Sequence, residues 1–152
     1  MTRRSRKSLA VASGFRLVRE GPSAAPSRTP IRWPKDVYQL MAPYASVEPG
    51  EVFWLLALDA QHCTTGPVVV SRGLLNSSLV HPREVFIRAI VANAAAIILV
   101  HNHPSGDPTP SPDDRVVTEQ LVEAGKVLGI PVQDHVIIGR GRYTSFAEAG
   151  LL

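Results

Sequence analysis

The chain has 152 residues, of which 45% are hydrophobic and 19% are charged. This is ordinary globular composition, and no apolar run reaches the roughly 18 residues that a membrane span requires. We therefore expect one soluble, cytoplasmic domain without a secretory signal, long enough to bury a core of its own. Cys63 is the only cysteine, which excludes an internal disulfide and a zinc site built from cysteines.

The net charge of +3 is distributed unevenly along the chain. Residues 1–32 contain eight basic residues and one acidic residue, whereas the remainder contains eight basic and twelve acidic residues. Residues 1–30 have no sustained hydrophobic period, so we predict a disordered basic tail ahead of a folded domain at 31–152. Such a tail can bind nucleic acid or an acidic partner through salt-sensitive electrostatics; the alternative is a tail that is only solvated.

The first predicted elements of the domain are one helix and two strands. A short amphipathic helix is predicted at 35–44, and Pro43 is expected to close it. The apolar run at 52–58 predicts a strand buried on both faces. A second strand is predicted at 65–71, where a glycine and a proline indicate a sheet edge or a bulge. The two strands are expected to form a hairpin.

The second half of the sequence alternates between helices and strands. Pro82 suits the first position of a helix that leads into an apolar strand ending at Val100. A helix over 111–129 begins with a Ser-Pro pair and ends at a glycine. Further extended segments are predicted at 132–138 and 143–146. These elements predict a mixed α/β (α+β) sheet flanked by helices.

Residues 101–114, HNHPSGDPTPSPDD, combine metal-binding side chains with loop-forming residues. His101 and His103 are two positions apart at the end of a strand, so both can face one side of it. The prolines and the glycine that follow exclude a regular helix, so a loop returns Asp114 toward the histidines. Three ligands with an open fourth position are typical of catalytic zinc. We therefore predict one zinc ion per chain, held by His101, His103 and Asp114.

The same segment also fits a simpler interpretation. Ser111 and Asp114 form a helix-capping pattern, in which the acidic side chain lies favourably in the positive first turn. This interpretation gives no role to two closely spaced histidines at the end of a buried strand. Capping and metal binding are compatible, because a carboxylate at the third helical position has a second oxygen to offer.

The motif resembles that of a known family. His-x-His-Pro, followed after six residues by Ser-x-x-Asp, is similar to the metal motif of the JAMM (MPN-plus) metallopeptidases, and HNHPSGDPTPS resembles the RadC family within them. The segments GLLNSSLVHPREVF and GIPVQDHVIIG also resemble RadC, so the resemblance extends from about Ile31 to the C-terminus. It implies a JAMM/MPN-like (cytidine-deaminase-like) fold and zinc-dependent hydrolysis of a peptide or isopeptide substrate. The chain is expected to be a short form without the helix-hairpin-helix-like region often found in the family.

The resemblance also implies two catalytic residues. In the JAMM pattern the catalytic glutamate lies at the entry to an early apolar strand, which is the position of Glu51, and a glutamate beside the metal suits proton transfer. Ser111 would, by the same resemblance, donate its hydroxyl to the oxyanion of the reaction intermediate. The alternatives are a solvated Glu51 and a Ser111 that only caps its helix. Glu84, in the first turn of a helix, is explained by the helix dipole alone.

Two other classes of function stay open. The DNA-repair name of RadC and the basic tail favour a nucleic-acid-binding protein or a nuclease. Phosphoryl transfer, however, usually needs a second metal or several cationic groups, and only Arg115 is basic within the motif region. A binding scaffold without chemistry is the third class, and the intact ligand set argues against it. His62, His81 and His135 are predicted to be structural. The sequence identifies neither the substrate nor the oligomeric state.

Overall fold

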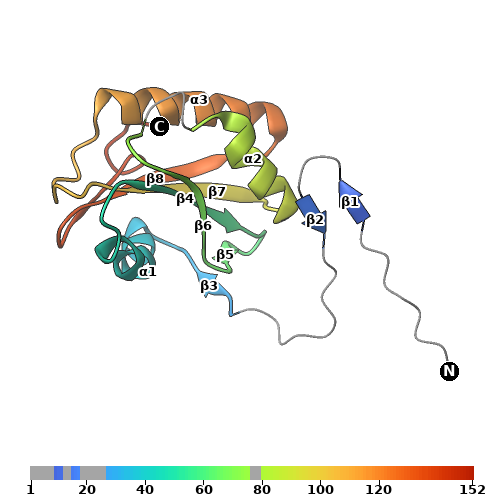
Figure 1. Ribbon diagram of the computed structural model, residues 1–152, viewed down its shortest axis with the longest axis horizontal. Helices are drawn as coiled ribbons and strands as arrows, with labels where there is room; N and C mark the ends of the chain where they lie inside the picture. The colour runs from blue at the N-terminus through green and yellow to red at the C-terminus, as the bar shows by residue number, and fades with distance from the viewer. Residues whose placement is uncertain (1–8, 12–14, 18–26, 76–79) are drawn as a thin grey trace.

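The computed structural model describes residues 9–11, 15–17, 27–75 and 80–152. The main body consists of α1 (Pro34–Ser46), β4 (Val52–Leu58), β6 (Pro67–Arg72), α2 (Pro82–Val91), β7 (Ala96–Asn102), α3 (Pro112–Leu128), β8 (Val132–Ile138) and β9 (Tyr143–Ser145). Its five-stranded sheet has the order β6-β4-β7-β8-β9. Helices α2 and α3 cover one face of this sheet, and α1 covers the other (Figure 1). The predicted mixed sheet flanked by helices is therefore confirmed.

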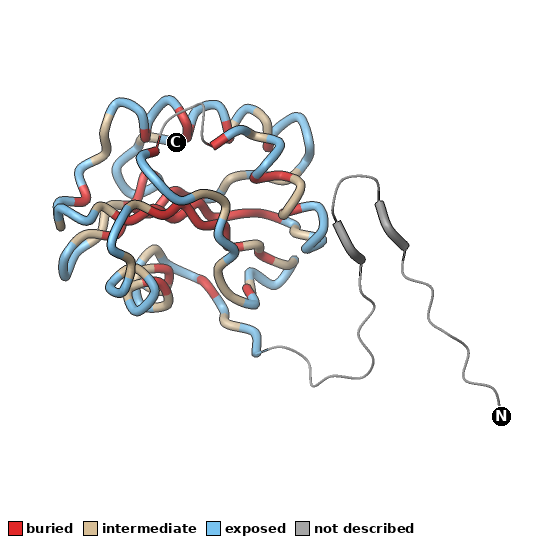
Figure 2. Tube along the Cα trace, in the orientation of Figure 1, coloured by how far each residue is buried: buried red, intermediate tan, exposed pale blue. Residues whose placement is uncertain are grey.

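The central strands separate two apolar cores. On β4, Trp54 and Leu56 belong to the core under α1, whereas Phe53 and Leu55 belong to the core under α2 and α3. Successive side chains of a strand point to opposite faces, so a strand between two helical layers must be apolar at every position. The buried trace along the middle of the body in Figure 2 follows these strands. The prediction of a strand buried on both faces at 52–58 is confirmed.

The connections of the sheet bring three chain segments together at one end of its central strands. Strand β4 is antiparallel to β7, so the start of β4 lies beside the end of β7. Strand β7 is parallel to β8, and the crossover between them contains α3. A parallel pair requires such a crossover, and α3 therefore begins near the end of β7. The start of β4, the end of β7 and the start of α3 thus meet.

Helix boundaries follow the expected capping chemistry with one exception. Pro82 and Pro112 occupy the first turns of α2 and α3, and Gly129 ends α3 in the left-handed conformation at φ 69°. Helix α1, however, continues through Pro43 to Ser46, so the prediction that this proline closes the helix was wrong. A proline removes one backbone donor, and that loss is tolerated here because the helix ends within its next turn.

The predicted hairpin is confirmed: β4 and β6 pair in antiparallel orientation, and β6 lies at the sheet edge. Between them β5 (Cys63–Thr64) pairs with β3 (Thr29–Pro30), and Arg28 forms an ion pair with Asp59. Contact with the domain body therefore begins slightly before residue 31.

Within the predicted tail, β1 (Leu9–Val11) and β2 (Phe15–Leu17) pair with each other in antiparallel orientation. The other residues of the tail up to residue 26 lie outside the described residues. Among the described residues, no helix combines the length and apolar character needed to cross a membrane.

Candidate metal centre

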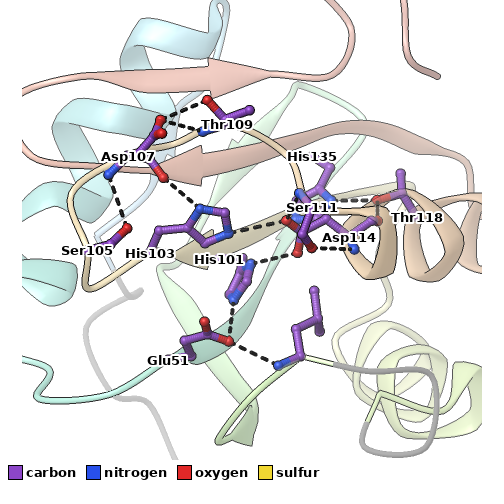
Figure 3. Close-up of polar contacts among 11 residues, drawn as sticks. Glu51, His101, His103, Ser105, Asp107, Thr109, Ser111, Asp114, Thr118 and His135 are labelled. Carbon is purple, nitrogen blue, oxygen red and sulfur yellow. Dashed lines mark hydrogen bonds and ion pairs between the residues drawn. The ribbon is translucent and has the colours of Figure 1, made fainter.

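The three predicted metal ligands come together at the end of the central strands, where β4, β7 and α3 meet. His101 lies within β7, which continues two residues beyond the predicted end at Val100. His103 follows the strand, and its backbone N–H still donates to the carbonyl of Ile138 in β8 at 2.9 Å. Asp114 lies in the first turn of α3. One ligand atom from each of the three side chains lies within 4.8 Å of the others, and Figure 3 shows them converging.

The loop between His103 and α3 is held in place by its own polar groups. The backbone carbonyl of Asp107 lies 2.7 Å from His103 Nδ1 and accepts a hydrogen bond from it. The carboxylate of Asp107 accepts from the backbone and the hydroxyl of Thr109 at 3.1 and 2.7 Å. These contacts leave Nε2 of His103 facing Asp114, with Nε2 3.2 Å from Oδ2. An imidazole that donates through one nitrogen has the other available for a metal.

Asp114 has one carboxylate oxygen for capping and one for a ligand. Oδ2 accepts from the backbone N–H of Ser111 at 2.7 Å, and Ser111 Oγ accepts from the backbone N–H of Asp114 at 3.1 Å. The helix cap formed by Ser111 and Asp114 is therefore confirmed, and it is compatible with a metal site. Oδ1 is buried and lies 3.2 Å from His101 Nδ1, yet neither atom has an aligned hydrogen-bond partner among the described residues.

These separations fit a metal ion. In a tetrahedral zinc site with bonds of about 2.0–2.1 Å, neighbouring ligand atoms are about 3.3–3.4 Å apart. Asp114 Oδ1 lies 3.2 Å from His101 Nδ1, close to this spacing, and one ligand atom from each of the three residues lies within 4.8 Å of the others. Buried polar atoms without partners are uncommon in folded proteins, and a cation among these atoms would satisfy them. His101, His103 and Asp114 can therefore hold a metal ion.

Electrostatics favour the charged carboxylate at this position. Burial raises the pKa of the Asp114 carboxyl, but the nearby imidazoles of His101 and His103 and the hydrogen bond from the Ser111 backbone together lower it well below its usual range. The hydrogen bond with Asp114 raises the pKa of His103. The positive end of the α3 dipole also favours an acidic side chain in the first turn. Because metal-bound imidazole is neutral, metal binding at this site displaces protons.

Glu51 lies immediately before β4 and faces the histidines. Its Oε2 accepts from the backbone N–H of Leu75 at 3.0 Å and lies 3.4 Å from His101 Nε2. Its backbone carbonyl accepts from the N–H of Gly73 at 2.9 Å. The Glu51 side chain is 22% exposed, so solvent reaches it while its position is restricted.

One hollow of about 410 Å³ contains all five residues predicted for the site. Its lining consists of Glu51, Leu74, Leu75, His101, His103, Pro104, Ser105, Ser111, Asp113 and Asp114. We call this the metal-site hollow. Ser111 Oγ is an acceptor in the helix cap, so its O–H can still donate into the hollow.

The other residues weighed in the sequence lie apart from this hollow. Glu84 is in the first turn of α2 and forms an ion pair with Arg88 at 3.2 Å. His81 caps α2 by accepting from the backbone N–H of Arg83 at 3.2 Å. His62 is exposed in a turn with φ 58°.

His135 is fully buried behind the centre. Its Nδ1 lies 2.6 Å from Thr118 Oγ1, and that hydroxyl in turn donates to the backbone carbonyl of Asp114 at 2.5 Å. Sequence reasoning missed Thr118 and Asn102 as residues that contact the site. The position of Thr118, four residues after Asp114 on one helix, is a signal that could have found it.

The fold and the site together define a class: a mixed α/β domain of the JAB/MPN-like type with a His-His-Asp set that can hold a metal. The sequence model described as the RadC-like JAB domain matches residues 31–151. The chain therefore belongs to the RadC-like JAB domain family, as its motif indicated.

Several proteins similar to this chain carry the name UPF0758 protein. The one from Methanosarcina barkeri is 52% identical over 119 residues, covering 78% of this chain and 52% of that protein. The one from Methanosarcina mazei is 49% identical over 148 residues, covering 96% and 64%. The one from Moorella thermoacetica is 55% identical over 126 residues, covering 83% and 55%. This chain thus matches between 52% and 64% of the length of these relatives, and their names state no activity.

Proposed function

We propose that this domain is a zinc-dependent metallopeptidase or isopeptidase of the JAMM type, which hydrolyses an amide bond in a peptide or isopeptide substrate. The observation that supports the proposal is the convergence of Glu51 with the three metal-binding side chains and Ser111 in the metal-site hollow. A metal site that served only structure would have no need of an acidic side chain beside its ligands, and it is usually closed by four of them.

Glu51 is the proposed general base. When bound, zinc supplies an activated water with a pKa near 7. The Glu51 carboxylate would accept the proton of the attacking water and deliver it to the leaving amine. The hydrogen bond from Leu75 N–H to Oε2 restricts this carboxylate, which would transfer the proton from its place beside His101.

Ser111 is the proposed oxyanion donor. Its Oγ is held by the cap of α3, in the same hollow as Glu51. A fixed hydroxyl can donate to the negative charge that develops on the carbonyl oxygen of the substrate, and one such donor is worth about 10²-fold or more in rate.

The test compares Glu51→Gln with the matched variant Glu84→Gln. The assay uses zinc-loaded full chain and a panel of fluorogenic peptides and isopeptide-linked reporters, with zinc content measured by mass spectrometry. Glu51→Gln should retain one zinc per chain and lose about 10²- to 10⁴-fold in rate. Glu84→Gln should match the wild type, because Glu84 pairs with Arg88 on another helix. His101→Ala should lose the zinc.

Three outcomes would contradict the proposal. An active Glu51→Gln with an inactive Glu84→Gln would place the base on α2. Stoichiometric zinc in His101→Ala would remove the ligand assignment. A wild type that cleaves no amide bond but cuts DNA in a zinc-dependent manner would favour the nuclease alternative.

A further inference from the structure

Asn102, between the two histidines of the motif, contacts the backbone on both sides of Glu51. It is the last residue of β7 and is only 3% exposed. Its Oδ1 accepts from the backbone N–H of Val52 at 2.7 Å, and its Nδ2 donates to the backbone carbonyl of Gly50 at 3.0 Å. These partners determine the orientation of the amide, because an N–H can only donate and a carbonyl can only accept.

We propose that Asn102 is a positioning residue that holds Glu51 at the metal centre. The inference rests on the proposed role of Glu51 as general base, and it assigns a role to the middle residue of the His-Asn-His sequence. Side chains alternate along a strand, so Asn102 points away from the side that His101 uses. Residues 101–103 thus carry the two histidine ligands on one side and, on the other, the amide that bonds the backbone around Glu51.

The pairing of β4 with β7 stops short of Glu51, so this residue needs another contact to hold it beside β7. The ladder between β4 and β7 ends at the pair Phe53 and His101. Glu51 lies beyond this last pair, so no ladder hydrogen bond joins it to the strand that carries the metal ligands. The two hydrogen bonds of the Asn102 amide take the place of the next rung of the ladder, on either side of Glu51.

The opposite side of Glu51 is held by the segment that follows β6. The backbone N–H groups of Gly73 and Leu75 donate to the carbonyl and the carboxylate of Glu51 at 2.9 and 3.0 Å. In the sheet, β4 lies between β6, which precedes that segment, and β7. Without Asn102, Glu51 would be held from the β6 side and could shift relative to His101. With it, the 3.4 Å separation between Glu51 Oε2 and His101 Nε2 is maintained.

The contact requires the asparagine side chain specifically. It needs a donor and an acceptor on the same short side chain. Aspartate would still accept from Val52 but would place a carboxylate oxygen against the carbonyl of Gly50, while alanine would leave both backbone groups without their present partner. Asn102→Asp and Asn102→Ala therefore remove one and two hydrogen bonds, respectively.

The control for general loss of stability is Ser145→Ala. Ser145 is also 3% exposed, and its hydroxyl donates to Asp134 at 2.6 Å on the far side of β8. This variant loses a buried hydrogen bond without contacting residues 50–52. Any effect that Asn102→Ala shares with it is a general effect of destabilisation.

The first measurement is amide hydrogen exchange, by NMR, of the metal-free full chain. The amide of Val52 reports on Asn102 directly, and the amide of Leu75 reports on the Glu51 carboxylate that accepts from it. In Asn102→Ala both amides should exchange about tenfold faster relative to the amides of α2, and in Asn102→Asp, which still accepts from Val52, only Leu75 should exchange faster. Ser145→Ala should not change this ratio.

The second measurement is hydrolysis by the zinc-loaded variants. Asn102→Ala should keep one zinc per chain and lower kcat by about ten- to a hundredfold while KM stays close to the wild-type value. This split is expected because a misplaced base impairs proton transfer and leaves substrate contacts intact.

The two measurements separate this inference from the proposed function. If the wild type hydrolyses no amide bond, the proposed function fails, and the Leu75 amide still decides whether Asn102 holds Glu51. Wild-type exchange of Val52 and Leu75 in Asn102→Ala would overturn the inference, as would a uniform acceleration equal to that of Ser145→Ala. If Asn102→Ala does not fold, the test uses Asn102→Asp, in which wild-type exchange of Leu75 would overturn the inference.

Discussion

Asp114 shows how one side chain serves both the fold and the site. A carboxylate has two oxygens, and in Asp114 one caps α3 while the other faces His101. The cap restricts the rotation of the side chain, so the second oxygen is directed before any ligand binds. Thr118 adds a second restraint, because its hydroxyl donates to the backbone carbonyl of Asp114. The start of α3 is therefore fixed by side chains as well as by its own backbone.

His135 completes this set of contacts. Thr118 uses its only hydroxyl proton toward Asp114, so it accepts from His135, which must carry its proton on Nδ1. The other nitrogen, Nε2, is buried without a partner among the described residues. The ring stacks on Phe146 with centroids 4.6 Å apart. This apolar environment favours the neutral imidazole.

This environment predicts a dependence of stability on pH. Burial lowers the pKa of His135 to about 3, whereas a histidine in the unfolded chain has a pKa of about 6.5. Below that value the unfolded chain binds a proton that the folded chain does not, so stability is lost as the pH falls from about 6.5 toward 3. The free energy of unfolding of the metal-free protein should fall by about 2 kcal/mol between about pH 8 and pH 5 through this residue.

The measurement is chemical denaturation in the presence of a chelator. His135→Phe should lack this part of the pH dependence, even though its absolute stability is lower. His62→Asn replaces an exposed histidine at a positive φ that asparagine tolerates, and it should retain the wild-type slope. Equal slopes in all three proteins would contradict the assignment of a neutral buried His135.

At the scale of elements, the loop from β7 to α3 is set against the turn that follows β8. A Cβ atom on Gly139 would lie 2.5 Å from the carbonyl oxygen of Gly106 and 2.7 Å from Pro108 Cδ. Gly106 itself has φ 91°, and its carbonyl accepts from the backbone N–H of Arg140 at 2.9 Å. The loop between His103 and Asp114 therefore packs directly against the backbone of Gly139, and a change of side-chain rotamer cannot make room for a larger residue there.

Gly139→Ala should displace this loop and weaken metal binding. The overlap with backbone cannot be relieved by a rotamer change, so we expect a loss of stability of about 1–3 kcal/mol together with a weaker zinc affinity. Thermal denaturation and zinc competition with a chelator measure the two effects. The matched variant is Gly141→Asn, at φ 67° with no atom within 4 Å, which should change both much less. Equal zinc affinities for Gly139→Ala and the wild type would contradict the prediction.

At the scale of the whole molecule, the centre is assembled from distant parts of the chain. Glu51 and His101 are separated by fifty positions, and Leu75 reaches Glu51 from the segment after β6. The site lies at the ends of the central strands, within the family match at 31–151, whereas most of the basic N-terminal segment lies outside that match. The two features can therefore be tested independently.

The basic tail is proposed to be the element that binds nucleic acid. Deleting residues 1–26 leaves Arg28 and the pairing of β3 with β5 in place, so folding and zinc binding should be unchanged. Association with duplex DNA should weaken, and its dependence on salt should become shallower, because fewer cations are exchanged on binding. Fluorescence anisotropy over a range of salt concentrations measures both quantities.

A tail of the same length with most of its basic charge removed is the matched control. Replacing Arg3, Arg4, Arg6 and Lys7 by glutamine keeps the length of the tail and should reproduce most of the effect of the deletion. Unchanged DNA binding at low salt in the deleted protein would show that the tail is not the electrostatic element.

The sequence by itself determined the local parts of this protein. The alternation of side chains at His101 and His103, the Ser-x-x-Asp cap and the prolines between them are effects of neighbouring residues. They predicted the start of the helix after the motif, and the end of the strand before it to within two residues. The apolar run at 52–58 indicated a strand between two layers for the same reason. Pro43 was misjudged because a proline near the end of a helix costs one hydrogen bond and does not end the helix at once.

Only the tertiary structure decided how these parts meet. The antiparallel register of β4 on β7 places Glu51 beside His101, and a different register would separate them, because a shift of one residue moves every side chain to the other face. Asn102 and Leu75 contact the site through hydrogen bonds to residues far away in the sequence. Such partners depend on long-range packing, and the residue types alone do not identify them.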